Sequence, residues 1–147
     1  MQVFLSHSGR DAAFTRRLYE AVRDAGLAPW AYWQDIPRNE NFVAEINRSL
    51  EESGVVVLVW SAAARASEWT EREWTAALAM EGEKQRRFLG VVVLDEKPLP
   101  ALLRTRNYTD GRLDQGKAIE DVVAWLRRQR QMRAGEAQDG RRSAASR

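Results

Sequence analysis

Short apolar stretches alternate along this chain with longer segments in which apolar residues recur every three or four positions. The first pattern is typical of buried strands and the second of amphipathic helices. Residues 55–60 are apolar at every position, as expected for a strand that is covered on both faces. Further strands are predicted at residues 2–6, 27–32, 88–94 and 106–108.

Helical periodicity fills the intervals between the predicted strands. One helix is predicted from Asp11 to a stop at Gly26, because its apolar residues fall on one face and its charged residues on the other. The remaining helices are predicted at residues 42–50, 67–85 and 116–131. Strands that alternate with helices in this way predict an α/β fold, in which helices cover both faces of an open, parallel, five-stranded sheet.

The chain divides by composition into a predicted domain, residues 1–131, and a basic tail, residues 132–147. The tail has no apolar period and is rich in Arg, Ala, Gly and Ser, so we expect it to be disordered or to act as a linker. Residues 127–147 hold seven arginines and two acidic residues, a net +5, whereas residues 1–126 hold 16 basic and 19 acidic residues, a net −3. The domain itself is therefore not expected to bind nucleic acid.

Composition excludes several classes of protein. The hydrophobic fraction of 44% and the charged fraction of 30% are ordinary for a globular domain. No apolar run approaches the ~20 residues of a membrane span, and the N-terminus shows no secretion signal. With no cysteine and one histidine, the chain has no disulfide, no thiolate nucleophile and no multi-histidine metal centre. We therefore expect a cytoplasmic protein without a metal site.

The segment 67–74 carries the clearest candidate for chemistry. If it begins a helix, the residues stacked on Trp69 are Glu73, Ala76, Ala77 and Met80. Glu73 is then the only charge in an apolar stripe, and a carboxylate that loses its hydration should have a raised pKa. Trp69, one turn earlier, offers a ring face to a flat or cationic ligand.

A structural role for Glu73 is the alternative. Thr70 and Glu73 have the spacing of a capping box, in which the carboxylate would only satisfy backbone amides at the helix start. Ser67 competes for the cap position. If Ser67 caps the helix, Glu73 lies inside it with no basic residue four positions away on either side.

Ligands of open parallel sheets bind beyond the carboxyl ends of the strands, where the strand order reverses. Loops that leave such ends are predicted at residues 6–10, 33–41 and 61–67. Glu73 can therefore share a crevice with His7, Ser8 and Trp33. Two of these residues could have structural roles instead. His7 fits a histidine at a strand end whose ring nitrogens are hydrogen-bonded within the fold, and Trp33 could pin its loop onto the domain. Ser8 has no partner base and is not predicted to be a nucleophile.

Four motifs in this order resemble those of TIR domains, specifically the bacterial kind. They are Phe4-Leu5-Ser6-His7-Ser8 at the first strand, Trp33-Gln34-Asp35-Ile36 with Phe42 at the second loop, Ser67-x-Trp69-x-x-x-Glu73, and Leu99-Pro100 after the fourth strand. The third is similar to the motif that carries the glutamate of NAD-cleaving members. The likeness covers about residues 2–131 and implies a flavodoxin-like TIR fold. The second loop departs from the family pattern, because residues 38–41 stand where a glycine is usual.

The resemblance implies that the chain cleaves the nicotinamide–ribose bond of NAD+, which would be its substrate rather than a cofactor. The nicotinamide of NAD+ is already cationic and departs neutral, so this reaction needs no general acid. An ionised Glu73 would stabilise the oxocarbenium-like ribosyl group in the transition state. The residues implied to bind the substrate are Trp69, His7, Ser8, Trp33 and Phe42. No G-x-G-x-x-G motif supports dinucleotide binding of the Rossmann kind.

The leading hypothesis is thus an NAD+ hydrolase that forms ADP-ribose or a cyclic variant. The resemblance further implies an effector of bacterial antiphage defence, activated by homo-oligomerisation through TIR–TIR contacts, with a sensor domain or partner protein in cis or in trans. A non-catalytic TIR adaptor that works by TIR–TIR contact is the alternative. A nucleoside ribosyltransferase is a third hypothesis, since that family has a similar fold and also uses a glutamate.

Overall fold

The computed structural model describes residues 1–33 and 40–146, with the backbone alone at residues 40–43. Its five strands are β1 (Gln2–Ser6), β2 (Ala28–Trp30), β3 (Val55–Trp60), β4 (Leu89–Val93) and β5 (Thr109–Asp110). All neighbouring strands pair in parallel, in the order β2-β1-β3-β4-β5. The predicted parallel five-stranded sheet is therefore confirmed, and its order reverses between β1 and β3, where the chain turns from one half of the sheet to the other.

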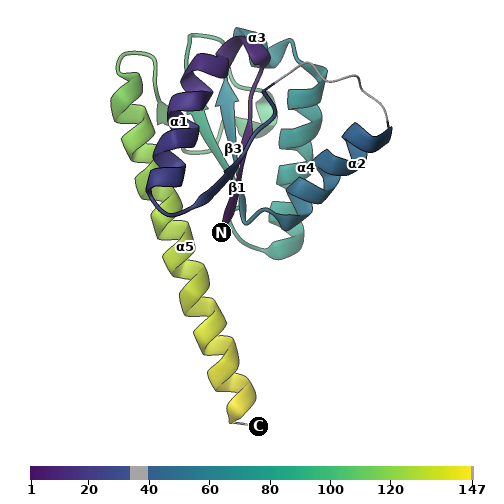
Figure 1. Ribbon diagram of the computed structural model, residues 1–147, viewed down its shortest axis with the longest axis vertical. Helices are drawn as coiled ribbons and strands as arrows, with labels where there is room; N and C mark the ends of the chain where they lie inside the picture. Colours follow the sequence, from purple (N-terminus) through teal and green to yellow (C-terminus); the bar gives the residue numbers. More distant parts are fainter. Residues whose placement is uncertain (34–39, 147) are drawn as a thin grey trace.

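Helices cover both faces of the sheet, as the sequence predicts (Figure 1). They are α1 (Ala12–Asp24), α2 (Glu40–Glu52), α3 (Ala62–Arg65), α4 (Glu68–Lys84) and α5 (Gln115–Ala145), with 3-10 turns η1 (Gly9–Asp11) and η2 (Ala101–Leu103). The short α3 lies where the sequence analysis expects a loop. It forms because the Ser61 side chain caps it by accepting a hydrogen bond from the Ala64 amide (3.1 Å).

The side chains of each strand alternate between two apolar layers. Val3 and Leu5 of β1 pack with residues of α1 and α5 in one layer. Phe4 lies in the other layer, with residues of α2 and α4. By the same alternation Ser6 points toward α4, and His7, the next residue, toward α1.

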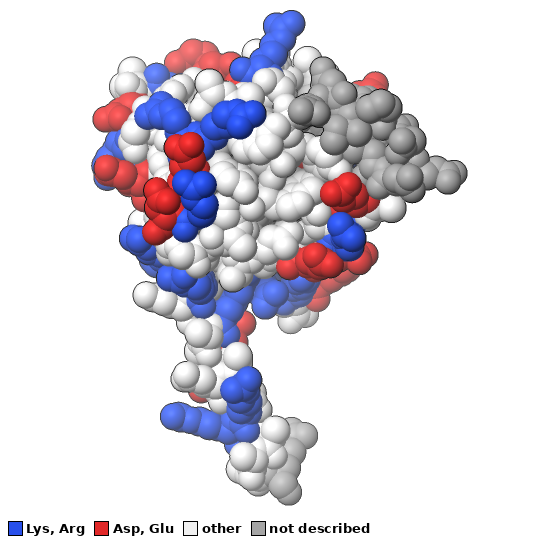
Figure 2. Space-filling view, viewed as in Figure 1, with Lys and Arg blue, Asp and Glu red and all other residues white. Residues whose placement is uncertain are grey.

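The last helix differs from the prediction for the tail. Residues 132–145 are not disordered but continue α5 as a helix that projects beyond the sheet (Figure 1). The reason is composition: Ala, Arg, Gln and Glu favour helix, and no proline interrupts the segment. The last buried residue of α5 is Gln129. Figure 2 shows Lys and Arg side chains where this helix leaves the body and along its projecting part.

Glu81 of α4 braces the start of β4. Its carboxylate accepts hydrogen bonds from the amides of Phe88 (3.0 Å) and Leu89 (2.9 Å) and from both terminal nitrogens of Arg106 (2.6 and 2.8 Å). Burial alone would raise the pKa of Glu81, but these hydrogen bonds outweigh burial and lower it. Arg106 also donates to the Leu89 carbonyl oxygen. This contact occupies the edge of β4, so strand pairing begins at Thr109 and not at the predicted residues 106–108.

We expect Glu81→Gln to lower the free energy of unfolding by about 2–3 kcal/mol near pH 7, because the nearly buried Arg106 guanidinium loses its charged partner. A lowered folded-state pKa means that the carboxylate stabilises the fold above its unfolded pKa of about 4.3. That contribution is lost as the pH falls through the folded pKa. Urea denaturation should therefore separate variant and wild type widely at neutral pH and narrowly at about pH 3.

Glu83→Gln is the matched control for this prediction. Glu83 lies exposed on the same helix, and its replacement should leave the unfolding free energy unchanged at both pH values. If Glu83→Gln lost as much stability as Glu81→Gln, the cause would be the loss of negative charge on α4, and not the loss of the contacts that Glu81 makes with Arg106 and β4.

Candidate functional site

The start of α4 places Glu73 inside the helix. Ser67 is the cap, since its hydroxyl oxygen accepts a hydrogen bond from the Thr70 amide (3.2 Å). The Thr70 hydroxyl in turn donates to Ser67 Oγ (2.9 Å). The capping box of Thr70 and Glu73 is therefore wrong, because the serine three residues before Thr70 already occupies the cap. The Glu73 carboxylate is free for another role.

Glu73 faces the sheet and not the solvent. The residue is 9% exposed, and no salt bridge links its carboxylate to a cation within residues 1–33 and 44–146. Burial raises the pKa of Glu73 to about 8, and the nearby Ser6 hydroxyl offsets part of the increase. Without a ligand the carboxyl is mostly protonated near pH 7. A cation beside it would favour the ionised form.

Ser6 is a site residue that the sequence analysis did not single out. It is the last residue of β1, is fully buried, and lies beside the Glu73 carboxyl. The alternation of side chains along β1 could have identified it, because Ser6 must share a face with Phe4, which belongs to the layer that α4 covers.

Trp69 lies one turn before Glu73, as predicted. Its ring is partly buried and packs in the layer that also contains Phe4, Trp30 and Tyr32. The Arg72 guanidinium carbon lies 5.0 Å from the centre of the Trp69 ring, a cation–π distance. Any ligand that stacks on this face of the ring must therefore displace Arg72.

His7 and Trp33 turn toward α1, on the opposite side of β1 from Ser6 and Glu73. The two rings are 5.3 Å apart, and Trp33 also meets Tyr19 edge-on (5.5 Å) and the Arg16 guanidinium (4.4 Å). Both Arg16 and Tyr19 belong to α1. The contacts of Trp33 are thus with His7 and α1, and the crevice that would join these two rings to Glu73 stays a prediction.

His7 is partly buried at the end of β1. Its Nδ1 lies 3.3 Å from the Leu5 carbonyl oxygen. Burial lowers the pKa of His7, although the contact with Leu5 opposes the shift. A neutral imidazole near pH 7 follows, consistent with a ring held by packing and not by charge.

Ser8 lies at the mouth of a groove of about 490 Å³ on the edge of the sheet where β1 and β3 end. Its side chain caps η1 by accepting a hydrogen bond from the Arg10 amide (3.4 Å). The opposite wall of the groove comes from α3 and the cap of α4, including Ser67. Ser8 and the start of α4 are therefore brought together, as predicted.

Phe42 and the second-loop residues Gln34, Asp35 and Ile36 lie outside the residues whose side chains are described. The backbone of α2 begins at Glu40. The substrate contact implied for Phe42 stays a prediction.

Hydrogen bonds connect residues around the groove that Ser8 lines. The Ser61 hydroxyl, at the end of β3, donates to Asp11 Oδ2 (2.5 Å). Asp95, beyond β4, accepts a hydrogen bond from the Ala62 amide (2.9 Å). Burial raises the pKa of Asp11, and the hydrogen bond from Ser61 opposes that shift. These contacts join the ends of three strands, and they give a further role to Asp11, which is predicted above only as the first residue of a helix.

Metal binding and membrane insertion would each require further features of the chain. Among the side chains that the structure describes, no group of three or more His, Asp or Glu is arranged to hold a metal ion. In the same part of the chain, no helix combines the length and the apolar character that crossing a membrane requires.

Comparisons with solved structures identify the fold. The TIR domain of the Toll-related receptor TRR-2 from Hydra magnipapillata superposes with a TM-score of 0.67 at 17% identity, over 89% of this chain and 97% of that one. The TIR domains of the activated Roq1 resistosome, which directly recognises the pathogen effector XopQ, give 0.68 at 20% identity, over 85% and 98%. The RPS4 and RRS1 TIR domain heterodimer gives 0.67 at 18% identity, over 88% and 98%. A comparison with curated protein sequences gave no match.

The family itself is shown by sequence. The model of the TIR domain family matches residues 3–126, which span β1 to the middle of α5 and include Ser6, Trp69 and Glu73. The strand order, the helices on both faces and the motifs at the ends of β1 and β3 agree with this match. The chain therefore belongs to the TIR domain family.

Proposed function

We propose that this TIR domain is an NAD+ hydrolase that cleaves the bond between nicotinamide and ribose, with Glu73 as the catalytic residue. The observation that carries the proposal is the buried Glu73 carboxyl, which has a raised pKa and no salt bridge among the described side chains. A carboxyl held in this state stabilises a positive charge more strongly than one in water, because the surroundings screen the charge less.

In the proposed reaction the bond from the ribose C1′ to the nicotinamide nitrogen breaks, and both electrons stay with nicotinamide, which leaves neutral. The ribosyl group becomes positive at C1′ and is stabilised by ionised Glu73. Water then attacks C1′, loses a proton to the solvent, and yields ADP-ribose. Attack by an adenine nitrogen instead of water would yield a cyclic product.

The neighbours of Glu73 support a division of roles. Ser6 would orient the carboxylate through its hydroxyl, and Trp69 would contact the nicotinamide once Arg72 moves from its ring. Ser8 would meet the substrate at the groove, where the side chain of Arg10 would supply donors for the diphosphate. His7 and Trp33 would act as positioning residues, because their contacts pack the end of β1 against α1. Phe42 is proposed to contact the substrate from α2.

The proposed setting follows the family resemblance. We propose a cytoplasmic effector of antiphage defence that assembles with copies of itself through TIR–TIR contacts, under the control of a sensor domain or partner. The neighbours include a TIR heterodimer and the TIR domains of a resistosome, so proteins of this fold do associate.

NAD+ consumption by protein clustered on beads or vesicles tests the proposed activity. Products are separated by chromatography, which distinguishes linear from cyclic ADP-ribose. Clustered protein should consume NAD+ faster than the same amount in dilute solution. If the protein assembles and leaves NAD+ intact, it is an adaptor; if it cleaves nucleosides in preference to NAD+, it is a ribosyltransferase.

We expect kcat/KM for NAD+ to rise with pH through about 8, because the free enzyme must lose the Glu73 proton before it can stabilise the ribosyl cation. The midpoint of kcat should lie lower, since the cationic nicotinamide lowers the pKa of Glu73 in the complex. Ser6→Ala should move the kcat/KM midpoint upward, because it removes the hydroxyl that lowers this pKa.

Ser8→Ala is the control for this profile. It alters the same loop without touching Glu73, so it should change KM and leave the midpoint in place. A midpoint near pH 4–5 for the wild type would contradict a buried, protonated carboxyl.

A further inference from the structure

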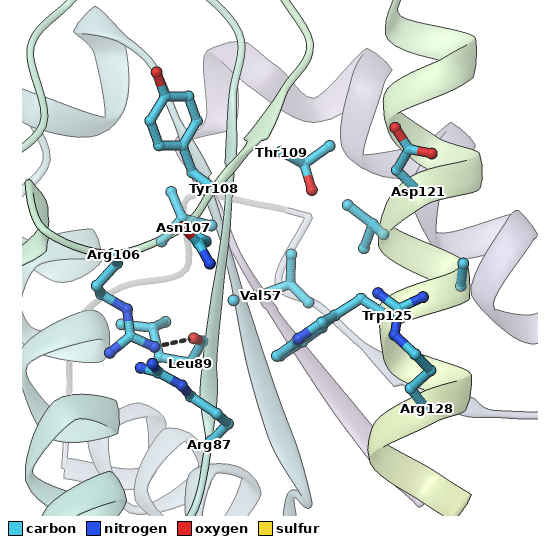
Figure 3. A pocket seen from close by; sticks show the side chains of 14 residues that line it. Val57, Arg87, Leu89, Arg106, Asn107, Tyr108, Thr109, Asp121, Trp125 and Arg128 are labelled. Carbon is cyan, nitrogen blue, oxygen red and sulfur yellow. Dashed lines mark hydrogen bonds between the residues drawn. The ribbon is translucent and has the colours of Figure 1, made fainter.

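A second cavity, of about 380 Å³, lies between α5 and the edge of the sheet (Figure 3). Its floor includes Val57 of β3 and Val122 of α5, which belong to the apolar layer on the α1 and α5 side. Glu73 and Trp69 lie on the other face of the sheet. The cavity is therefore separate from the candidate catalytic site.

The cavity exists because β5 is only two residues long. Its pairs with β4 are Val92 with Thr109 and Val93 with Asp110, so among the described residues no strand pairs with the outer edge of β4 before Val92. The chain at residues 106–108 passes beside this edge, anchored by Arg106, and forms one wall. Gly90 completes the floor: a Cβ atom there would lie 2.7 Å from Cζ3 of Trp125, so the indole rests directly against the glycine backbone.

Two arginines flank one end of the cavity from opposite sides, Arg87 from the loop before β4 and Arg128 from α5 (Figure 3). Arg87 has an ion-pair distance of 3.7 Å to Glu81, whose oxygens are already engaged by Arg106 at 2.6 and 2.8 Å. Arg128 has no ion pair with any acidic side chain that the structure describes. Among the side chains that the structure describes, this end therefore carries more positive than negative charge.

Neighbouring cations strengthen the positive charge at this end. Arg133 donates a hydrogen bond to the Arg87 carbonyl oxygen (3.1 Å). The pKa values of Lys84 and Arg133 are both lowered, first by burial and then by repulsion from Arg86. These three side chains do not line the cavity, but they add to the positive charge of the surface around Arg87.

The other end of the cavity offers hydrogen-bond acceptors. Asp121 and Thr109 lie there, with Asn107 and Tyr108 along the wall (Figure 3). Lys117 Nζ lies 3.0 Å from Asp121 Oδ1. This contact does not use the second carboxylate oxygen of Asp121. The cavity thus has cations at one end, an indole in its floor and acceptors for amino groups at the other end.

We propose that this cavity binds a nucleoside phosphate. The phosphate lies between Arg87 and Arg128, the flat base contacts Trp125, and the exocyclic amine of the base donates toward Asn107 or Asp121. The cavity volume lies within the range of about 300–1,000 Å³ that small-molecule sites occupy. The proposal does not depend on the proposed NAD+ hydrolysis, because it uses none of the residues around Glu73.

The test is a titration of the full chain with AMP, followed by NMR of the indole N–H signals. The Trp125 and Trp69 signals are assigned with Trp125→Phe and Trp69→Phe. AMP should shift the Trp125 signal and leave that of Trp69 in place. Adenosine and inorganic phosphate should each bind at least about tenfold more weakly than AMP, because each lacks one half of the contacts.

Variants of the two arginines provide the second arm. Arg87→Gln and Arg128→Gln should each weaken AMP binding about tenfold, as expected for loss of one charged phosphate contact. Arg127→Gln, which changes an exposed neighbour on α5, should bind AMP as the wild type does. All three residues are exposed, so these variants should fold.

Three outcomes would overturn the proposal. They are a shift of Trp69 in place of Trp125, which would place AMP at the Glu73 site; unchanged affinity in Arg87→Gln and Arg128→Gln; and no shift of any indole signal at millimolar AMP. None of these outcomes decides whether the protein cleaves NAD+, so failure here and failure of the proposed activity are distinguishable.

Discussion

Replacing Glu73 by glutamine is expected to stabilise the protein at alkaline pH, by about 3–5 kcal/mol near pH 9. Burial raises the pKa of Glu73 from 4.5 to about 8, so the folded state keeps a proton that the unfolded state has already lost. For a carboxyl whose pKa is raised by folding, stability falls as the pH rises from about 4.5 to about 8. Glutamine does not ionise, so the variant avoids this loss.

Urea denaturation of wild type and Glu73→Gln at pH values from about 4 to 9 measures this effect. The two proteins should have similar unfolding free energies at the acid end, and the variant should be increasingly more stable above about pH 5. Glu68→Gln is the matched control, because Glu68 is exposed on the same helix and should show no such divergence. A Glu73→Gln protein that is less stable than wild type at pH 8 would mean that the carboxylate has a stabilising partner.

The buried Glu73 carboxyl is expected to lower the free energy of unfolding at neutral and alkaline pH. Its presence is therefore not explained by a contribution to stability. Stability is often given up at functional sites, where charged groups are held away from water. The expected gain from Glu73→Gln would therefore support a functional role for the carboxyl before any activity is measured. It would also show that the variant is folded, which makes its activity interpretable.

Local periodicity was enough to predict the sheet and most helices. The apolar run of β3 and the amphipathic pattern of α1 depend on neighbouring residues only, so they can be recognised without a structure. The position of β5 could not be predicted this way. It depends on Arg106, which reaches Glu81 and the Leu89 carbonyl oxygen from far along the chain.

The candidate site was predicted in part for a similar reason. Glu73 stands out because it interrupts an apolar helical stripe, and its burial follows from the same stripe. The grouping of His7 and Trp33 with Glu73 stays a prediction, since the contacts seen for these two rings are with each other and with α1. The alternation of side chains along β1 would have grouped Ser6 with Glu73. The helical continuation of α5 past residue 131 was missed because an absent apolar period does not exclude helix where propensity is high.

The second large effect concerns catalysis by the same residue. Glutamine keeps the size of Glu73 and can still accept a hydrogen bond from Ser6, but it carries no charge. Loss of one preorganised group that stabilises transition-state charge costs about 10²–10³-fold in rate. We therefore expect the release of nicotinamide by Glu73→Gln to fall by at least that factor, with little change in KM if binding relies on the groove and on Trp69.

Catalysis by Glu73 is tested by measuring nicotinamide release from NAD+ by clustered wild type beside clustered Glu73→Gln, near pH 8. Both proteins must first be shown to be folded and equally assembled. If Glu73 is catalytic, the wild type releases nicotinamide and the variant is slower by a factor of about 10² or more. Equal rates for the two proteins, or no release by an assembled wild type, would contradict catalysis by Glu73.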